Sequence, residues 1–239
     1  MTRLALFDLD HTLIPTDSDH EWGRFMIKLG IVDPTAFARD NERFFEDYRN
    51  GCLDIHAYLR VALAPLTQHP RDQLDLWHEQ FMQEVIVPQI LPQARALVAE
   101  HQAQGDVCCL ITATNAFVTA PIGRALGIEH LLAIDLKTEM HPDDIAAGTP
   151  DGAAALRGRY TGEVDGVPSF QAGKITRTEA WLASRGEKLS DFERSFFYSD
   201  SRNDIPLLEK VSDPVATNPD DTLRAHAKAH GWRILELFN

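Results

Sequence analysis

Cysteine is scarce in this sequence: three of its 239 residues are cysteines, too few for a disulfide framework. Cys52 stands alone, whereas Cys108 and Cys109 are neighbours within residues 107–111, an apolar segment typical of a buried strand. We expect these two thiols to serve as small apolar side chains in the core. Free thiols in this arrangement favour a reducing compartment, so we expect a cytoplasmic protein.

Clusters of basic residues are also missing. The sequence has 23 Lys and Arg against 36 Asp and Glu, which gives a net charge of −13. Nucleic-acid backbones are bound by concentrated Lys and Arg, so we expect no nucleic-acid partner. Long apolar runs are missing too, and the short run at residues 4–7 is interrupted at once by Asp8 and Asp10. We therefore expect neither a signal peptide nor a membrane partner.

With 44% hydrophobic residues, the chain can bury a substantial core. From residue 16 to 87 its apolar side chains recur at helical spacing in four groups, and no segment has a convincing strand pattern. The groups are Trp22, Phe25, Met26 and Leu29; Phe37, Phe44, Phe45 and Tyr48; Ile55, Tyr58, Leu59, Ala62 and Leu63; and Leu74, Trp77, Phe81 and Val85. Gly51 predicts the end of the second helix and Pro65 the end of the third. We predict a four-helix bundle whose stripes form its core.

Residues 88–239 instead alternate between helical and strand patterns. We expect helices at 92–104, 115–126, 174–185, 204–211 and 220–230, and strands at 107–111, 131–135, 195–199, 214–217 and 233–237. This order predicts an α/β fold, a Rossmann-like parallel sheet with helices on both faces, which includes the opening apolar strand. The predicted domains are an α/β core, residues 1–15 and 88–239, and an inserted helical cap, residues 16–87. Residues 141–167, rich in Gly, Ala, Asp and Pro, predict a long loop or an irregular β excursion.

Asp8 and Asp10 stand two residues apart where the opening strand should end, and Thr12 follows at the same spacing. Two carboxylates at the end of a buried strand repel each other and lose hydration. A divalent cation offsets that cost, because hard cations prefer carboxylate oxygens. Open α/β sheets bind ligands beyond the carboxyl ends of their strands. The pattern therefore predicts a metal-assisted active site at this edge, directly below the inserted helices.

Three further segments place polar residues at the same predicted edge of the sheet. These residues are Thr112, Ala113, Thr114 and Asn115 after one strand, Lys174 at the start of a helix, and Asp200, Ser201, Arg202, Asn203 and Asp204 after another strand. Each has an ordinary explanation when taken alone: Thr112 or Asn115 as a helix cap, and Lys174 as a solvated surface lysine. Their convergence on one edge favours a functional site.

In this order the motifs resemble those of the haloacid dehalogenase-type phosphohydrolases. The matching elements are the opening Asp8-x-Asp10-x-Thr12, the apolar strand ending in Thr112, the isolated Lys174 and residues 199–204. The helical insertion between the first two motifs is similar to the all-helical C1 cap of the phosphoserine phosphatase-like branch, subfamily IB. Residues 17–22, 111–122 and 197–201 look most like those of bacterial histidinol-phosphate phosphatases in this superfamily.

The resemblance implies a mechanism for phosphomonoester hydrolysis. Asp8 would be the nucleophile that forms an aspartyl-phosphate, and Asp10 would act first as general acid and then as general base. Mg²⁺ would be held by the Asp8 carboxylate, the Asp10 main-chain carbonyl and the Asp200 carboxylate. The remaining roles implied are phosphate binding by Thr112, Ala113 and Lys174, bracing of the loop by Thr12, and support by Asn203 and by Asp204, which would act through water or by orienting Lys174.

The acids at the start of the cap are candidates for selecting the substrate. Asp17, Asp19 and Glu21 could hold a cationic amine, and they are equally suited to cap and initiate the first cap helix. The resemblance favours Asp17 as the residue nearest the substrate. An amine is present in both L-histidinol phosphate and phosphoserine, so these acids alone do not separate the two substrates.

A cationic side chain that binds the substrate carboxylate would distinguish the two substrates, because phosphoserine carries a carboxylate that needs such a partner. Arg43, Arg49 and Arg60 are available in the cap, but none of the three stands out. His20 and Trp22 could stack on an imidazole ring, although Trp22 fits the bundle core better. We therefore favour L-histidinol phosphate.

Three other classes of function are alternatives for these motifs. A phosphomutase or phosphotransferase would share all four motifs, whereas a dehalogenase needs no metal and fits Asp10 and Asp200 less well. A catalytically silent protein that binds a phosphometabolite has no need for both Asp8 and Asp10. We expect a small phosphorylated metabolite as the partner of the protein, and a monomer or a homodimer as its state.

Overall fold

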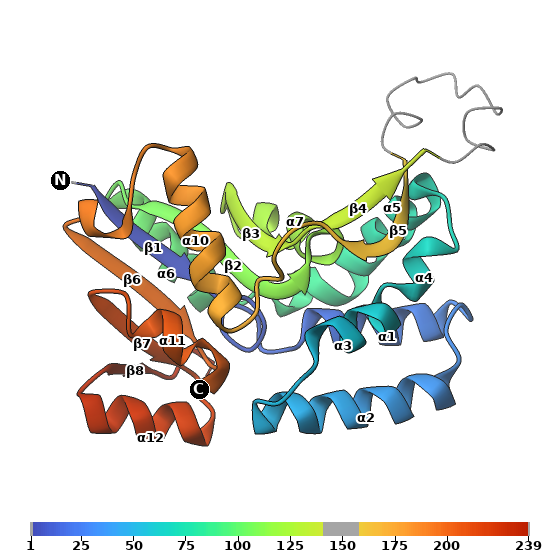
Figure 1. Ribbon diagram of the computed structural model, residues 1–239, viewed down its shortest axis with the longest axis horizontal. Helices are drawn as coiled ribbons and strands as arrows, with labels where there is room; N and C mark the ends of the chain where they lie inside the picture. The colour runs from blue at the N-terminus through green and yellow to red at the C-terminus, as the bar shows by residue number, and fades with distance from the viewer. Residues whose placement is uncertain (1, 141–157, 239) are drawn as a thin grey trace.

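The computed structural model describes residues 2–140 and 158–238. Its centre is a six-stranded parallel sheet in the order β3-β2-β1-β6-β7-β8 (Figure 1). The strands are β1 (Arg3–Phe7), β2 (Val107–Asn115), β3 (His130–Ile134), β6 (Arg194–Ser199), β7 (Asp213–Thr217) and β8 (Arg233–Leu235). β1 lies in the middle and pairs with β2 on one side and β6 on the other, so the direction of winding changes there. The predicted Rossmann-like sheet is confirmed.

Both faces of this sheet are covered by helices, because successive side chains of a strand point to opposite faces. Ala5 and Phe7 of β1 join a core with residues of α6 (Pro92–Ala103) and α7 (Ala116–Ala125). Leu4 and Leu6 join a second core on the other face. Its helices are α10 (Ala172–Ser184), α11 (Ile205–Leu208) and α12 (Asp221–His230).

The segment from Ser18 to Gln89, which precedes α6, is helical apart from its short connections. It consists of α1 (Ser18–Lys28), α2 (Pro34–Asn50), α3 (Ile55–Ala62), α4 (Ala64–Thr67), α5 (Arg71–Phe81), a π-helical turn (Met82–Ile86) and a 3₁₀ turn (Val87–Gln89). The four predicted apolar groups fall mainly on α1, α2, α3 and α5, and Gly51 ends α2 in the left-handed conformation, with φ of 72°. Pro65 was expected to end the third helix, but it lies in the first turn of α4, where its missing N–H costs nothing.

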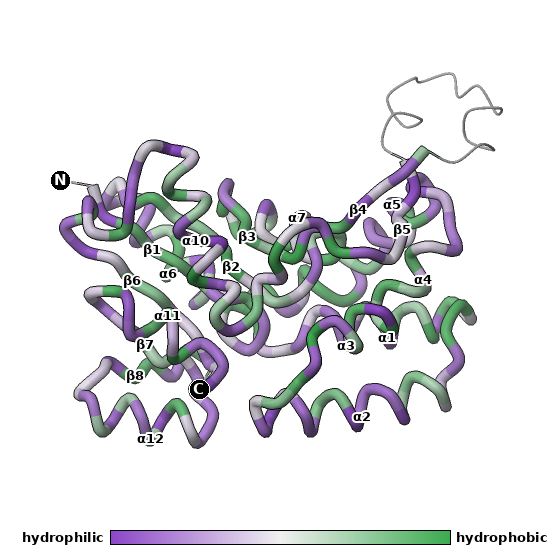
Figure 2. Tube along the Cα trace, in the orientation of Figure 1, coloured by the Kyte–Doolittle hydropathy of each residue, from purple (hydrophilic) through white to green (hydrophobic). Residues whose placement is uncertain are grey.

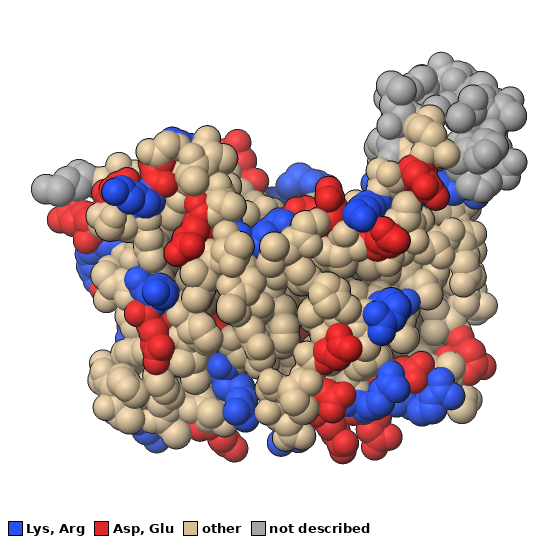
Figure 3. All heavy atoms as spheres, in the orientation of Figure 1, with Lys and Arg blue, Asp and Glu red and all other residues tan. Residues whose placement is uncertain are grey.

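The prediction that all four stripes form core is wrong for α2. Phe44 is the buried residue of this helix, whereas the Phe45 side chain is 55% exposed. Figure 3 shows side chains of both charge signs along α2, and in Figure 2 the helix alternates between hydrophilic and hydrophobic residues. By contrast Trp22, Phe25 and Phe81 lie in the same core as residues of the sheet. α2 is therefore the least embedded long helix of the insertion.

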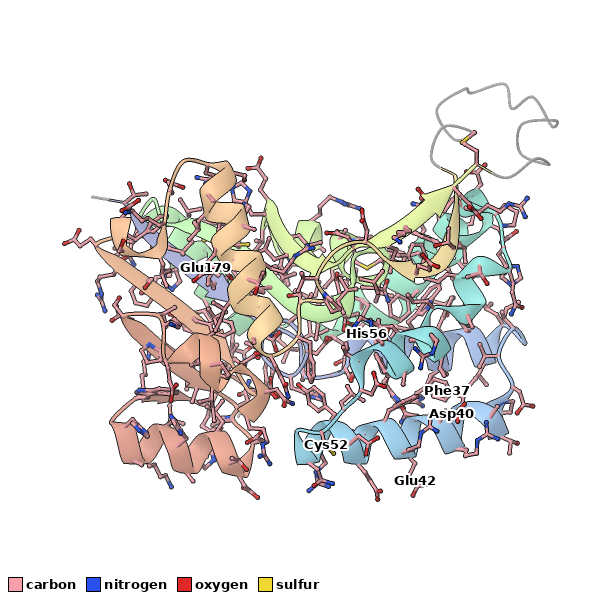
Figure 4. The ribbon with its side chains drawn as sticks, viewed as in Figure 1. Phe37, Asp40, Glu42, Cys52, His56 and Glu179 are labelled. Carbon is pink, nitrogen blue, oxygen red and sulfur yellow. The ribbon has the colours of Figure 1, made fainter. Side chains whose placement is uncertain are left out.

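A glycine brings α2 close to α1. A Cβ atom at Gly23 would collide with the Phe37 ring, so any larger residue there would push the two helices apart. Phe37 also contacts the His20 ring, with 5.5 Å between ring centroids. In Figure 4 Phe37 lies on the side of α2 that faces the other helices, and Glu42 extends away from them.

A small antiparallel sheet follows β3. It pairs β4 (Leu136–Glu139) with β5 (Arg159–Val164), and Tyr160 packs edge-on against Phe117 of α7 with 5.7 Å between ring centroids. The β excursion predicted within residues 141–167 is thus present at β5, whereas residues 141–157 lie outside the described part of the chain. Its partner β4 was not predicted, because residues 136–139 lack the buried side chains that would indicate a strand.

Several boundaries differ from the prediction, among them the last strand, which ends at Leu235 and not at residue 237, and two differences are larger. β2 continues past residue 111 to Asn115, with an irregularity in its pairing to β3. The helix expected at 204–211 is a 3₁₀ turn, Arg202–Asp204, followed by the short α11. Within the described residues, no helix has the length and apolarity needed to cross a bilayer.

Candidate active site

The carboxyl ends of β1, β2 and β6 and the start of α10 meet at one edge of the sheet. They border a cavity of about 520 Å³ that is closed on its other side by residues of α1, α2 and α3. The predicted site residues that line it are Asp8, Asp10, Asp17, Thr112, Ala113, Lys174, Asp200, Asn203 and Asp204. The four segments therefore converge, as the strand order requires.

Lys174 lies between two carboxylates. Its Nζ donates to Asp8 Oδ1 at 2.9 Å and to Asp204 Oδ2 at 2.7 Å, and all three side chains are buried. Burial alone would lower the pKa of Lys174, but the carboxylates of Asp204 and Asp8 outweigh it and hold that pKa above its ordinary value. Lys174 is thus a fixed cation and not a solvated surface lysine. Asp204 also accepts from the Ser199 hydroxyl at 2.7 Å, which fixes its orientation.

Burial raises the pKa of Asp8 to about 6, even though the Lys174 ammonium opposes the shift. Thr12, which is fully buried, lies between Asp8 and Asp200: its hydroxyl oxygen is 3.5 Å from Asp8 Oδ2 and 3.3 Å from Asp200 Oδ1. The Asp200 N–H donates to the same hydroxyl oxygen at 3.0 Å. The predicted bracing position of Thr12 therefore joins two loops of the site.

Asp10 is held by groups from two different segments. Its Oδ1 accepts from the Ser18 N–H at 2.7 Å, and its Oδ2 accepts from the Thr114 hydroxyl at 2.9 Å. Burial, followed by the nearby Asp17 carboxylate, raises the pKa of Asp10 to about 8. A carboxyl group with this pKa carries a proton near neutral pH, so it can donate one to a leaving group.

The end of β2 provides hydroxyl and amide groups. Thr112 is buried, and its hydroxyl oxygen accepts from the Thr114 N–H at 3.1 Å. The helix cap here is Asn115, whose side chain accepts from the Val118 N–H at 3.1 Å, so the capping explanation holds for Asn115 and not for Thr112. The Thr112 proton stays available for an oxygen in the cavity.

The turn before Lys174 is tightly packed. A Cβ atom at Gly173 would collide with the carbonyl oxygen of Pro168, so only glycine fits at this position. Gln171 has φ of 47°, which is uncommon for a residue with a side chain. Its amide donates to Asn203 Oδ1 at 3.1 Å and to the Gly51 carbonyl at 3.3 Å.

The C-terminal turn of α2 is attached to the core by several such bonds. Asn203 Nδ2 donates to the Tyr48 carbonyl at 3.3 Å, and Arg202 donates to the Arg49 carbonyl at 3.3 Å. The Tyr48 hydroxyl donates to Ser201 Oγ at 2.9 Å, directly beside Asp200. Burial, together with the carboxylates of Asp200 and Asp204, holds the pKa of Tyr48 well above its usual range, so it remains a donor.

The acids at the start of α1 have three different positions. Asp17 caps α1, with Oδ1 accepting from the His20 N–H at 2.9 Å, and also lines the cavity. Asp19 does not line it; its carboxylate accepts from the Tyr58 hydroxyl and from Asn115. Glu21 pairs with Arg24 at the surface. Asp17 therefore both caps α1 and lines the cavity, and Asp19 connects α1 with α3 and with the end of β2.

The other cap candidates are separated in the same way. Trp22 is 4% exposed and packs against Phe25, Phe81 and Phe117, so it cannot stack on a ligand. Arg49 borders the cavity, whereas Arg43 lies over the Phe44 ring and neither Arg43 nor Arg60 lines the cavity.

The charges of the site fit a divalent cation. Asp8, Asp10, Asp200 and Asp204 supply four carboxyl groups, and Lys174 is the only Lys or Arg that the structure describes as buried. Burial and the carboxylates of Asp8 and Asp204 hold the pKa of Asp200 well above its usual range. A hard cation between Asp8 and Asp200 would relieve this repulsion. Among described residues no three His, Cys, Asp or Glu side chains form a complete metal cage, so main-chain oxygen and water would complete the coordination.

Four residues of the site had no assigned role in the sequence analysis: Tyr48, Thr114, Gln171 and Ser199. Thr114 and Ser199 are adjacent to predicted residues, and their hydroxyls fix Asp10 and Asp204. The sequence signal that could identify them is their position: Thr114 lies two residues after Thr112, and Ser199 lies directly before Asp200. No sequence signal identifies Tyr48 or Gln171, because contacts between α2 and the sheet depend on how the inserted helices dock.

Three comparisons identify the family of this chain. The model of the haloacid dehalogenase-like hydrolase family matches residues 5–209. The histidinol-phosphatase of Neisseria meningitidis serogroup C is 46% identical over 237 residues, which cover 99% of this chain and all of that protein. A Bordetella pertussis Tohama I protein of unknown function has a crystal structure with a TM-score of 0.87, 46% identity and complete coverage of both chains.

A more distant match supports the fold alone. A phosphoserine phosphatase with bound substrate has a TM-score of 0.63 at 18% identity, covering 99% of this chain and 93% of that one. The family match and the extent of the Neisseria alignment are sufficient for the assignment: the chain belongs to the haloacid dehalogenase-like hydrolase family.

Proposed function

We propose that this protein is a Mg²⁺-dependent phosphatase that hydrolyses L-histidinol phosphate through an aspartyl-phosphate on Asp8. The broader class, phosphoric monoester hydrolase, follows from the family together with the Neisseria relative. One observation carries the proposal: Lys174 joins Asp8 to Asp204 while Asp10, with a pKa of about 8, borders the same cavity.

Each residue has a role that its surroundings support. Asp8 attacks the phosphorus, and Asp10 gives its proton to the leaving alcohol and then takes one from the attacking water. Lys174, Thr112 and the main chain at Ala113 bind the phosphoryl oxygens. Mg²⁺ held by Asp8, the Asp10 carbonyl and Asp200 would neutralise phosphoryl charge. Thr12, Asn203 and Asp204 orient these groups.

The helical segment 16–87 serves as a cap over residues 1–15 and 88–239 in this proposal. Its contact with the core at Asp10 supports this role, because the Ser18 N–H belongs to the first turn of α1. The side of the cavity formed by α1, α2 and α3, called the cap wall below, carries the groups that select the leaving alcohol. Asp17 keeps Oδ2 free of hydrogen bonds within the described structure, and we assign the substrate amine to it.

Phosphate release tests the function directly. We would compare L-histidinol phosphate with O-phospho-L-serine, each in Mg²⁺ and in excess chelator. The proposal expects Mg²⁺-dependent release with a large preference for L-histidinol phosphate. A preference for phosphoserine would instead make Arg49, which borders the cavity, the carboxylate partner. Lack of release from any phosphomonoester, including p-nitrophenyl phosphate, would indicate a silent phosphometabolite-binding protein and overturn the proposal.

A further inference from the structure

The cavity extends away from the catalytic carboxylates along α2. Tyr48, which bonds to Ser201 beside Asp200, lies at the catalytic end. Phe45 and Phe44 lie one helical turn from Tyr48 toward the N-terminus of α2. Asn41 lies one turn further in the same direction, beside His20 of α1. Seven residues of helix span about 10 Å, so the cap wall reaches well beyond the phosphoryl position. A group that contacts Asn41 therefore lies about two helical turns along α2 from Tyr48.

His20 and Asn41 form a defined pair at the far end. The His20 Nδ1 lies 3.1 Å from Asn41 Oδ1, and an amide oxygen only accepts, so this contact is a hydrogen bond in the tautomer with the proton on Nδ1. In the neutral ring His20 Nε2 then keeps a lone pair, and Asn41 keeps its NH₂ group. The described residues supply no other side-chain partner to either group, and both residues line the cavity. The pair therefore offers one acceptor and one donor, fixed relative to each other.

An imidazole ring presents the complementary groups. A neutral imidazole has one N–H and one nitrogen lone pair on the same rigid ring. The Phe45 side chain, 55% exposed on the cavity wall, supplies an apolar surface for the flat face of such a ring. The Arg49 guanidinium lies over the Phe45 ring, 5.8 Å from its centroid, whereas the Phe44 ring packs against Tyr58 with 5.4 Å between ring centroids.

We infer that His20 and Asn41 form a subsite that recognises the two nitrogens of the substrate's imidazole ring, with Phe45 against the ring. This inference rests on the proposed function and adds the residues that choose the substrate. Gly23 supports the subsite indirectly, since its missing Cβ lets Phe37 pack on α1 and keeps Asn41 within reach of His20. Asp17 holds the amine, so ring and amine are recognised by separate groups.

The test compares two phosphomonoesters that share an amine and differ in the ring: L-histidinol phosphate and ethanolamine phosphate. The variants are Asn41→Leu, which removes donor and acceptor at similar volume, and His20→Phe, which keeps a ring against Phe37. We expect each to lower the ratio of the two kcat/KM values by about 10- to 100-fold, because a site built to hydrogen-bond a ligand discriminates against ligands that lack the matching groups. Glu42→Gln, on the outer side of α2, is the matched control and should leave the ratio unchanged.

The possible outcomes distinguish a failure of the inferred subsite from a failure of the proposed function. Equal losses on both substrates would show that the pair merely holds α1 against α2, which overturns the inference and leaves the function intact. An unchanged ratio in both variants would overturn the inference in the same way. A parent enzyme that hydrolyses p-nitrophenyl phosphate but shows no preference for L-histidinol phosphate would overturn the proposed substrate and the subsite together.

Discussion

The cavity has two walls that are built differently. The core wall is formed by the ends of β1, β2 and β6 and the start of α10, and the cap wall is formed by α1, α2 and α3. On the core wall Asp8, Lys174 and Asp204 are 6%, 3% and 2% exposed, and each is fixed by hydrogen bonds to other buried groups. On the cap wall Phe45 is 55% exposed and α2 contributes one buried residue. Under the proposed function, the chemistry would depend on groups fixed by burial, and substrate choice would depend on groups whose exchange costs the fold little.

The largest expected effect is on the core wall. Asp8→Asn removes the proposed nucleophile while keeping its size and its hydrogen-bonding oxygen, so we expect kcat to fall by at least about 10⁴-fold. Phosphate release under saturating substrate measures this loss, with circular dichroism to establish that the variant is folded. Turnover close to that of the parent would exclude Asp8 as the nucleophile.

Lys174→Met should be the most destabilising change among the site residues. It leaves Asp8 and Asp204 buried without their shared cation, and removal of one partner from a buried ion pair costs about 3 to 5 kcal/mol. Urea unfolding in chelator measures the free energy of unfolding, and Lys210→Met, at an exposed lysine, is the control. A loss no greater than that of the control would mean that the ion pairs contribute no net stability.

Asp10→Asn should give a pH-dependent change in stability. The pKa of Asp10 is raised to about 8 by burial and by Asp17, against about 3.9 in an unfolded chain. Stability from the bound proton is therefore complete below about pH 4 and is lost as the pH rises toward 8. The variant cannot ionise, so in chelator we expect it to exceed the parent by about 1–2 kcal/mol at pH 8 and by less at pH 5. Urea unfolding at both pH values measures this, and an equal difference at the two would contradict the assignment.

Tyr48→Phe tests the attachment of α2 to the core and should have the smallest effect. It removes the hydroxyl that donates to Ser201, and one neutral hydrogen bond contributes about 1 kcal/mol. We expect KM to rise about fivefold and the free energy of unfolding to fall by no more than about 1 kcal/mol. Ser201→Ala and the double variant complete a cycle in which the second change should add little. Additive losses would show that the two groups act separately.

The residues of the core wall were predictable because they lie next to the ends of strands in the sequence. Asp8, Thr112, Lys174 and Asp200 each follow a recognisable apolar segment or open a helix, and parallel strands bring such ends together. The sheet was predictable for the same reason, since its buried strands are short, apolar and separated by amphipathic helices. β4 was missed because its side chains are mostly exposed.

The cap wall was not predictable to the same degree. Helical spacing identified α1, α2, α3 and α5, but spacing alone does not show which stripe faces a core and which faces a cavity, as Phe45 demonstrates. Trp22 was a plausible ring-stacking residue until its burial among aromatic rings was known. The Gly23–Phe37 contact and the bond of Gln171 to the Gly51 carbonyl depend on docking between helices far apart in sequence.

The shallow embedding of α2 has an evolutionary consequence. A helix that gives only Phe44 to the interior can exchange Asn41, Phe45 or Arg49 with small changes in folding free energy. Under the proposed function, changes along this one helix can therefore alter the accepted leaving group without disturbing the buried Asp8, Lys174 and Asp204. Related chains with the same carboxylates and different α2 sequences should then differ in substrate long before they differ in chemistry.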